Sequence, residues 1–317
     1  MQLQIDAQIG FVADETRSKF AICSSIIKGF LFSLKRERVE RLGGYNKVTL
    51  WDIARETRTE SDGDCGICLE YALHDSISQK NPLVWPIVSE AINDYCKIKD
   101  GAHSILFGAE KNNYINLINS NSHYINPQTR ILHGTPGKPV YLEKYMDAIT
   151  KSIYNAPARE LLPQSIRGLW RADLFVGSPN TNQWVGTTLK INKDALKGDT
   201  GLRLGMYPEK RRGERIEYNE RLNLIMCPIP YDGHFMEAYY KSYGIMRAII
   251  HSDCNMPPPV LLADSGDRYI ADELIKRKNF PALEISEALK VMGQPGLIAA
   301  STPSGEIQAV ASTFLTV

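Results

Sequence analysis

Apolar residues recur at helical spacing in the first and last thirds of the chain. Between residues 14 and 41 the repeat includes Phe20, Ile27 and Leu31, which is the spacing of one face of a helix. The turn at 61–64 carries Ser and Asp, which are good capping residues ahead of a further helical run. We expect helices over residues 14–41, 47–58, 66–78, 87–98, 140–155, 234–251 and 267–277.

The middle of the chain has a different, strand-like pattern. Residues 172–177 and 183–191 are short runs rich in β-branched and aromatic side chains. The turn-rich segment Ser-Pro-Asn-Thr-Asn separates them, so the sequence predicts a hairpin. Strands mixed with helices indicate an α/β or α+β class. Further strands are expected over 203–207 and 222–228, and a C-terminal hairpin over 296–317.

Composition and charge indicate what kind of protein this is and which partners it could bind. The chain has 317 residues, of which 43% are hydrophobic and 23% charged, as expected for a packed globular protein. The formal net charge of +1 means that a nucleic-acid partner would have to meet a local basic patch. The N-terminus lacks a targeting pattern, and the apolar stretch 21–34 is interrupted by Lys28. We therefore expect a cytoplasmic protein without a membrane-spanning segment.

Three charged side chains stand at positions where the pattern predicts burial. Asp173 lies at the start of the first hairpin strand, and Lys190 lies at the end of the second. On the helix from Gly66, Glu70 shares a face with Leu73 and Ile77, so it points inward. A buried charge needs a partner, and the three residues form either a catalytic group or an ordinary buried network.

A carboxylate on a helix, a carboxylate on one strand and a lysine on the next resemble the PD-(D/E)xK nuclease superfamily. The matching runs are 66–73, 172–176 and 184–190. The resemblance implies a restriction-endonuclease-like core, in which helices flank a central mixed β-sheet. On this interpretation residues 61–230 form the core. Residues 1–60 would add an N-terminal helical segment, and residues 231–317 a C-terminal helical and hairpin segment.

The resemblance also implies a chemistry, which is metal-dependent hydrolysis of DNA phosphodiester bonds by a restriction or anti-phage endonuclease. Glu70, Asp173 and Lys190 would be the catalytic residues. Mg²⁺ or Mn²⁺ would be held by Glu70, Asp173 and position 188, where the family usually has Asp or Glu and this chain has Thr188. This departure leaves open that the core binds DNA without cutting it. The resemblance is compatible with a single chain, a homodimer or a subunit of a larger complex.

Basic residues follow the predicted hairpin and could contact phosphates. The candidate nucleic-acid-binding residues are Lys193, Lys197, Lys210, Arg211 and Arg212. The alternative is a solvated turn whose charge is balanced by nearby glutamates.

Two alternatives rest on Cys65. The run Asp62-Gly63-Asp64-Cys65 resembles the start of ovarian-tumour-type cysteine proteases, in which a histidine such as His234 or His251 would act as base. The pair Cys65 and Cys68 also has the spacing of zinc ligands, without a second pair.

A last alternative is a non-catalytic nucleic-acid-binding module. It would use the aromatic residues Phe235, Tyr239, Tyr240 and Tyr243. At helical spacing, such a stripe more often belongs to the core.

Overall fold

The computed structural model describes residues 2–6, 14–58, 63–106, 126–132, 140–152, 155–162, 172–198, 203–231, 235–293 and 312–316. The chain divides into two units. The first, called here the helical unit, consists of Met1–Asp75, Asn81–Leu83 and Asp232–Val317. The second, the sheet unit, consists of Ser76–Lys80 and Val84–Tyr231. Both ends of the chain therefore belong to the same unit.

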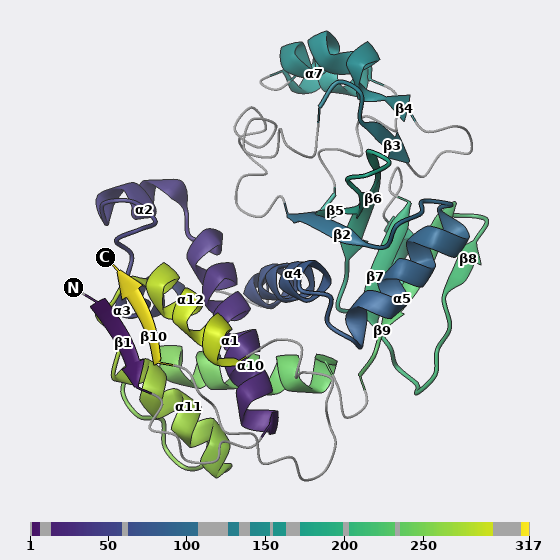
Figure 1. Ribbon diagram of the computed structural model, residues 1–317. Helices are drawn as coiled ribbons and strands as arrows, with labels where there is room; N and C mark the ends of the chain where they lie inside the picture. Colours follow the sequence, from purple (N-terminus) through teal and green to yellow (C-terminus); the bar gives the residue numbers. More distant parts are fainter. Residues whose placement is uncertain are drawn as a thin grey trace. The chain divides into compact units, whose positions relative to one another are not determined.

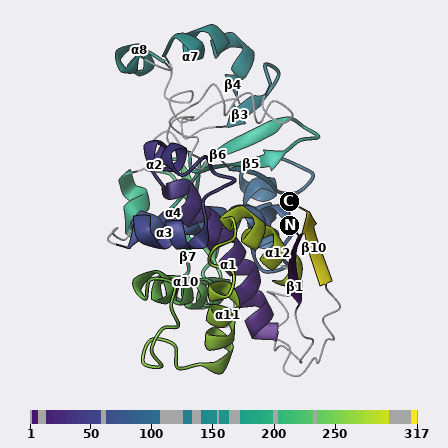
Figure 2. The same ribbon diagram turned by 90° about the vertical axis from the view of Figure 1, so that its left-hand side faces the viewer.

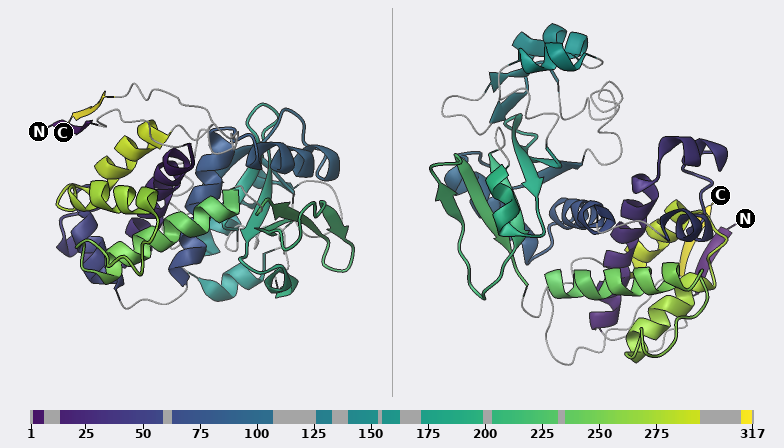
Figure 3. Two further views of the ribbon diagram at one scale, coloured as in Figure 1. Left: turned by 90° about the horizontal axis from the view of Figure 1, so that it is seen from below. Right: turned by 180° about the vertical axis from the view of Figure 1, so that it is seen from behind.

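Helix α1 (Asp14–Ser33) is the centre of the helical unit. It packs against helices from the other end of the chain, above all α10 and α12 (Figure 3). From Thr16 to Ile27 every residue of α1 is buried, as expected of a helix covered on all sides. The other helices of this unit are α2 (Arg36–Arg41), α3 (Leu50–Thr57), α4 (Gly63–Ser78, up to Asp75), α10 (Phe235–His251), α11 (Ser265–Ile275) and α12 (Ala282–Gly293).

Polar residues on the buried faces of α1 have partners on the C-terminal helices. Lys19, which is 2% exposed, forms an ion pair with Asp267 of α11. The hydroxyl of Ser24 donates to the main-chain oxygen of Ser286 on α12 at 2.8 Å, and the Ser286 hydroxyl donates to the Ser24 oxygen at 3.0 Å. These bonds give the buried polar groups partners. Without partners, burial of these groups would destabilise the fold.

Several helix boundaries differ from the sequence prediction. The helix expected over 140–155 is a short strand at Val140–Tyr141, a 3-10 turn at Leu142–Tyr145 and a helix only at Met146–Ser152. The helix expected over 14–41 is two helices, because the chain leaves helical geometry at Leu34 and Lys35 between α1 and α2. Helix α5 (Val84–Glu90) begins before Pro86 and not after it. Proline is tolerated in the first turn of a helix, where its missing N–H has no intrahelical acceptor. The sequence interpretation also missed α12.

The two ends of the chain form a small sheet. Strand β1 (Gln2–Asp6) pairs antiparallel with β10 (Ser312–Thr316), and the views agree that they lie side by side (Figure 2). The expected C-terminal hairpin turn at Pro303-Ser304-Gly305 lies outside the described residues. The described end of that segment pairs with the N-terminus, where no strand had been predicted.

The sheet unit is built on an eight-stranded mixed sheet with the main order β2-β5-β6-β7-β9-β8 (Figure 1). Strands β5 and β6 form the predicted antiparallel hairpin, while β6, β7 and β9 are parallel to one another. Strands β5, β7 and β9 are buried along their whole length, as is typical of strands covered on both faces. The strands are β2 (His103–Leu106), β3 (Arg130–Leu132), β4 (Val140–Tyr141), β5 (Leu174–Ser178), β6 (Gln183–Leu189), β7 (Leu204–Pro208), β8 (Glu217–Asn219) and β9 (Leu224–Ile229).

Helical segments flank this sheet. Helix α5 and the π-helix η1 (Ala91–Tyr95) pack against β9, and the 3-10 helix η5 (Lys193–Gly198) packs against β7. The remaining segments are the 3-10 helix η3 (Leu142–Tyr145), α7 (Met146–Ser152) and α8 (Ala156–Glu160). The α/β class with a mixed, helix-flanked sheet is therefore confirmed. Among the helices of the described ranges, none is both long enough and apolar enough to cross a bilayer.

Candidate active site and nucleic-acid interface

Asp173 ties the two strands of the β5–β6 hairpin together. Its main-chain amide donates to the Thr187 oxygen at 2.8 Å. Its carboxylate oxygen Oδ2 accepts from the Thr188 hydroxyl at 3.0 Å and from the Leu189 amide at 2.8 Å. Asp173 is 7% exposed and Thr188 is fully buried. The predicted metal ligand Thr188 therefore donates its hydroxyl to the predicted carboxylate ligand.

Lys190 lies two residues after Thr188, whose hydroxyl donates to Asp173. The strand register pairs Leu174 with Thr187. Alternation along β6 puts the Thr188 and Lys190 side chains on one side of that strand. Lys190 is half-buried, and its amide continues the ladder to the Met206 oxygen at 3.0 Å. The hairpin thus carries two members of the predicted trio on neighbouring strands.

Glu70, the third member, belongs to the helical unit. It is half-buried on α4, whose inward face is marked by the buried side chains of Leu73 and Ile77, as the spacing predicted. A Cβ atom on Gly29 of α1 would lie 2.6 Å from the Cα of Cys68, so α1 and α4 pack in close contact. Up to Asp75, α4 belongs to the same unit as the terminal helices, whereas the sequence interpretation had residues 61–230 in one core.

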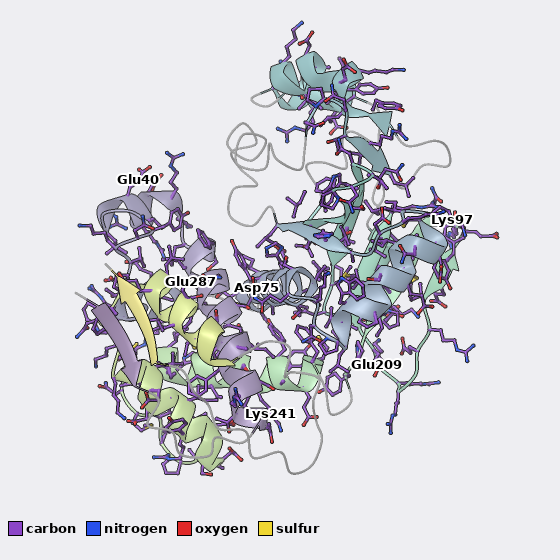
Figure 4. All side chains as sticks on the ribbon, viewed as in Figure 1. Glu40, Asp75, Lys97, Glu209, Lys241 and Glu287 are labelled. Atoms are coloured by element: carbon purple, nitrogen blue, oxygen red, sulfur yellow. The ribbon has the colours of Figure 1, made fainter. Side chains whose placement is uncertain are left out.

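The parallel strands deliver several polar segments to one edge of the sheet. Because β6, β7 and β9 are parallel, their carboxyl ends lie at the same edge, which is where ligands bind in open α/β sheets. Lys190 follows β6, Glu209 (labelled in Figure 4) follows β7, and Tyr231 comes shortly after β9. Strand β5 runs the other way, so Asp173, the residue before it, lies at this edge. We call Asp173, Lys190, residues 191–198 and 209–216, and Tyr231 the carboxyl edge.

Segment η5 is held at this edge by a small apolar contact. A Cβ atom on Gly205 of β7 would lie 2.8 Å from a methyl carbon of Leu196, so the glycine makes room for η5. Leu196 is fully buried in a cluster with Tyr207, Leu224 and Met226. The contact fixes Lys193 and Lys197 beside the loop after β7.

The predicted phosphate-binding residues come together here, and carboxylates lie among them. Lys193 lies 2.8 Å from Glu217, with its ammonium 5.0 Å from the ring centre of Tyr207. Asp194 joins the two basic segments, because Lys197 lies 2.8 Å and Lys210 3.9 Å from its carboxylate. The basic cluster predicted from sequence is therefore one surface, partly neutralised by its own acids.

Glu214 organises the loop after β7. Its carboxylate accepts from the amides of Lys210 at 3.0 Å and Arg211 at 3.2 Å, and from the Tyr207 hydroxyl at 3.0 Å. Burial raises the pKa of Glu214, but these hydrogen bonds outweigh burial and leave the pKa below its usual value. Burial, together with the Glu214 bond, raises the pKa of Tyr207 to about 12. At neutral pH Glu214 is thus ionised and Tyr207 is a hydrogen-bond donor.

The electrostatic state of Lys193 follows from the same contacts. Burial lowers the pKa of Lys193, and the bonds to Glu217 and Tyr207 raise it by more, so the pKa lies above the ordinary value. Lys193 is therefore a fixed cation inside the cluster. Lys197, Lys210, Arg211 and Arg212 are exposed and form its accessible part.

Comparison of the chain with protein-family models, with curated proteins and with solved structures finds no significant match. The function is therefore inferred from the geometry of this chain alone.

The structure does not bring His251 to Cys65, as the cysteine-hydrolase alternative requires. The Cys65 thiol, in the first turn of α4, lies 3.6 Å from the Tyr239 hydroxyl of α10. His251 is at the far end of the same helix, twelve positions after Tyr239, or about 18 Å along the axis. It instead contacts Arg247 at 2.9 Å, while His234 lies outside the described residues. This geometry does not support the protease hypothesis for His251.

The zinc alternative is disfavoured by the state of Cys68. Its thiol is fully buried and donates to the Ile26 oxygen at 3.5 Å. Burial, with the nearby Cys65, raises the pKa of Cys68 well above its usual value, so the protonated thiol is favoured over a thiolate ligand. Among the described residues, no group of three His, Cys, Asp or Glu side chains could hold a metal.

The aromatic stripe on α10 belongs to the core. Phe235 and Tyr239 are fully buried, and Tyr243 stacks on Phe30 of α1 with ring centres 5.8 Å apart. These rings are therefore packed within the helical unit, which confirms the core interpretation of the stripe.

Tyr207, Asp194 and Tyr231 are not among the site residues that the sequence predicts. Tyr207 and Asp194 act through contacts between segments that are separated along the chain, which no local pattern reveals. Tyr231 could have been noticed as an aromatic residue between Pro230 and Asp232, where a strand prediction had already ended.

Proposed function

We propose that the carboxyl edge of the sheet unit binds DNA and hydrolyses its phosphodiester bonds with Mg²⁺ or Mn²⁺, as the resemblance to PD-(D/E)xK nucleases implies. The observation that carries the proposal is the parallel arrangement of β6, β7 and β9. It puts the Asp173–Lys190 hairpin and the basic loops at one edge, so a phosphate held by the loops would lie near the carboxylate and the lysine.

Each residue has a role that its surroundings support. Lys210, Arg211 and Arg212 are exposed cations that would hold the DNA backbone. Lys190, two residues after the Thr188 that bonds Asp173, would offset the negative charge that develops on the phosphoryl group. The bonds from Thr188 and Leu189 fix Asp173 in one orientation, as a metal ligand requires.

The donor set suits a weakly held hard cation. The sheet unit offers Asp173 beside the Thr188 hydroxyl, and Mg²⁺ commonly binds one or two carboxylates while water and phosphate oxygens fill the other positions. When bound, the ion would polarise the phosphate and lower the pKa of a water molecule. The chain's own contribution is to orient Asp173 and to hold Lys190 beside it.

Cleavage is tested by incubating the protein with plasmid and linear DNA in Mg²⁺ or Mn²⁺ against an EDTA control. We expect metal-dependent products. Lys190→Met, which keeps the apolar stem, should reduce the rate by 100-fold or more if the ammonium stabilises the transition state. Glu70→Gln in the same cleavage assay tests the third member of the predicted trio. Absence of any metal-dependent product from the wild-type protein would refute the nuclease proposal.

Binding at the edge is tested by the salt dependence of affinity. Changing Lys210, Arg211 and Arg212 together to Ala should flatten the slope of log affinity against log salt by roughly two to three. The matched control changes three exposed lysines elsewhere in the sheet unit, Lys99, Lys144 and Lys151, and should leave the slope unchanged. Equal slopes for both triple variants would show that the loop does not touch phosphates.

A second candidate is a module that binds nucleic acid without cutting it. The specific observation in its favour is Thr188, which occupies the family's acidic position and donates to Asp173. This candidate predicts the same salt dependence with no metal-dependent product, so the two assays together separate the two functions.

A further inference from the structure

The carboxyl edge exposes apolar side chains beside its cations. Ile191, shortly after β6, is 42% exposed, and Tyr231, shortly after β9, is 44% exposed. Strand β7 lies between β6 and β9, so the backbones of β6 and β9 are about 10 Å apart. The basic loop that starts at Glu209 leaves β7 between them. The edge therefore combines an aromatic ring, an aliphatic side chain and several positive charges.

Tyr231 is fixed to the start of the basic loop. Its amide donates to the Glu209 carboxylate at 3.1 Å, and the Glu209 amide donates to the Ile229 oxygen at 2.9 Å. The backbone at Tyr231 and the first residue of the loop therefore hold each other in place. The backbone that carries the exposed ring is therefore tethered next to the first residue of the basic loop and has little freedom to lose on binding.

An exposed ring beside phosphate-binding cations suits one form of nucleic acid better than the other. In a duplex the base faces are stacked on one another, so only phosphates and groove edges are available. A single strand offers phosphates and base faces together, and proteins bind it with cationic grooves that carry aromatic stacking residues.

We propose that the carboxyl edge takes single-stranded nucleic acid, with a base stacked on the Tyr231 ring and the neighbouring phosphates on Lys210, Arg211 and Arg212. This inference rests on the proposed function, because it names the form of the substrate at the same edge. Ile191 supplies an apolar contact for a second base on the other side of the loop.

The experiment compares Tyr231→Ala, Tyr231→Phe and Tyr141→Ala in the full-length protein. Tyr141 is a matched control, because it lies on β4 of the same unit and is 40% exposed. The probes are a fluorescent 20-nucleotide oligothymidylate, an abasic strand of the same length and a 20-base-pair duplex. Affinity is measured by anisotropy, and a thermal melt verifies that each variant is folded.

We expect the wild-type protein to bind the oligothymidylate more tightly than the abasic strand or the duplex. Tyr231→Ala should weaken binding to the oligothymidylate about tenfold and leave the abasic strand unaffected. Tyr231→Phe and Tyr141→Ala should match the wild type.

The inference is overturned if Tyr231→Ala stays within twofold of the wild type, or if Tyr231→Phe is as weak as Tyr231→Ala. It is also overturned if the duplex binds at least as tightly as the oligothymidylate. These outcomes differ from failure of the proposed function, in which the wild-type protein binds none of the three probes or cleaves no substrate.

Discussion

Asp173 has a structural part as well as a candidate catalytic one. The same carboxylate oxygen accepts two hydrogen bonds from β6 while the residue is 7% exposed. A buried donor that loses its acceptor costs more than the bond itself contributes, because it was removed from water. The role of this residue therefore has to be separated from its effect on stability.

We predict that Asp173→Ala lowers the free energy of unfolding by about 2 kcal/mol, since the Leu189 amide and Thr188 hydroxyl lose their acceptor. Asp173→Asn keeps an oxygen acceptor, so it should lower the free energy of unfolding by less than half as much. Both should abolish cleavage. Urea unfolding and the plasmid assay measure the two effects.

The matched control is Asp253→Asn, which removes the charge of an exposed pair with Arg58. Like Asp, Asn tolerates the positive φ of 51° at this position. Exposed pairs contribute about 0–1 kcal/mol, so unfolding should change little and cleavage should persist. Cleavage by a folded Asp173→Asn protein would remove this carboxylate from the mechanism.

At the scale of elements, glycines decide how closely neighbours can pack. Gly29 lets α1 approach α4, and Gly177 lets β5 approach the backbone of β6, where an added Cβ would lie 2.1 Å from the Gln183 oxygen. Gly244, on α10, has open space around its Cβ position. Close packing therefore requires glycine at positions 29 and 177, whereas position 244 has room for a larger side chain.

We predict opposite signs for one substitution in two helices. Gly29→Ala should lower the free energy of unfolding by about 1–3 kcal/mol, because the Cβ overlaps the Cys68 backbone. Gly244→Ala should raise it by about 0.5–1 kcal/mol, because alanine restricts the unfolded chain and is preferred in helices. Thermal and urea unfolding of both variants test the pair. A stabilised Gly29→Ala protein would contradict the close approach of α1 and α4.

At the scale of the whole molecule, the two units differ in how they are built from the chain. The sheet unit is nearly continuous, from Ser76 to Tyr231, while the helical unit needs segments from both ends. Asp173, Lys190, the basic loops and Tyr231 all belong to the sheet unit. Its candidate surface should therefore not depend on the helical unit for these side chains.

We predict that a fragment spanning residues 76–231 folds cooperatively and binds DNA with the salt slope of the full chain. The physical reason is that its strands are buried within their own sheet and flanking segments. Circular dichroism melts and anisotropy titrations measure this. The reciprocal deletion of α12 should unfold the helical unit, since α1 loses its Ser286 contacts. A fragment without a cooperative melt would show that the units depend on each other.

Local patterns in the sequence determined most of the elements. The period of apolar residues predicted α3, α4, α10 and α11, and the alternation around 172–191 predicted the hairpin that carries Asp173 and Lys190. It also gave the shared face of Thr188 and Lys190, because side-chain direction in a strand depends only on its own backbone. These features need no knowledge of distant partners.

Only the tertiary structure decided which elements meet. The apolar face of α4 is evident from its spacing, but its partner α1 is set by the close approach at Gly29. The polar residues of α1 resemble a solvent-facing side until α11 and α12 cover them. The parallel pairing of β6, β7 and β9 gathers the basic loops at one edge. Periodicity reports which side of an element is apolar, whereas packing between distant segments determines what covers that side.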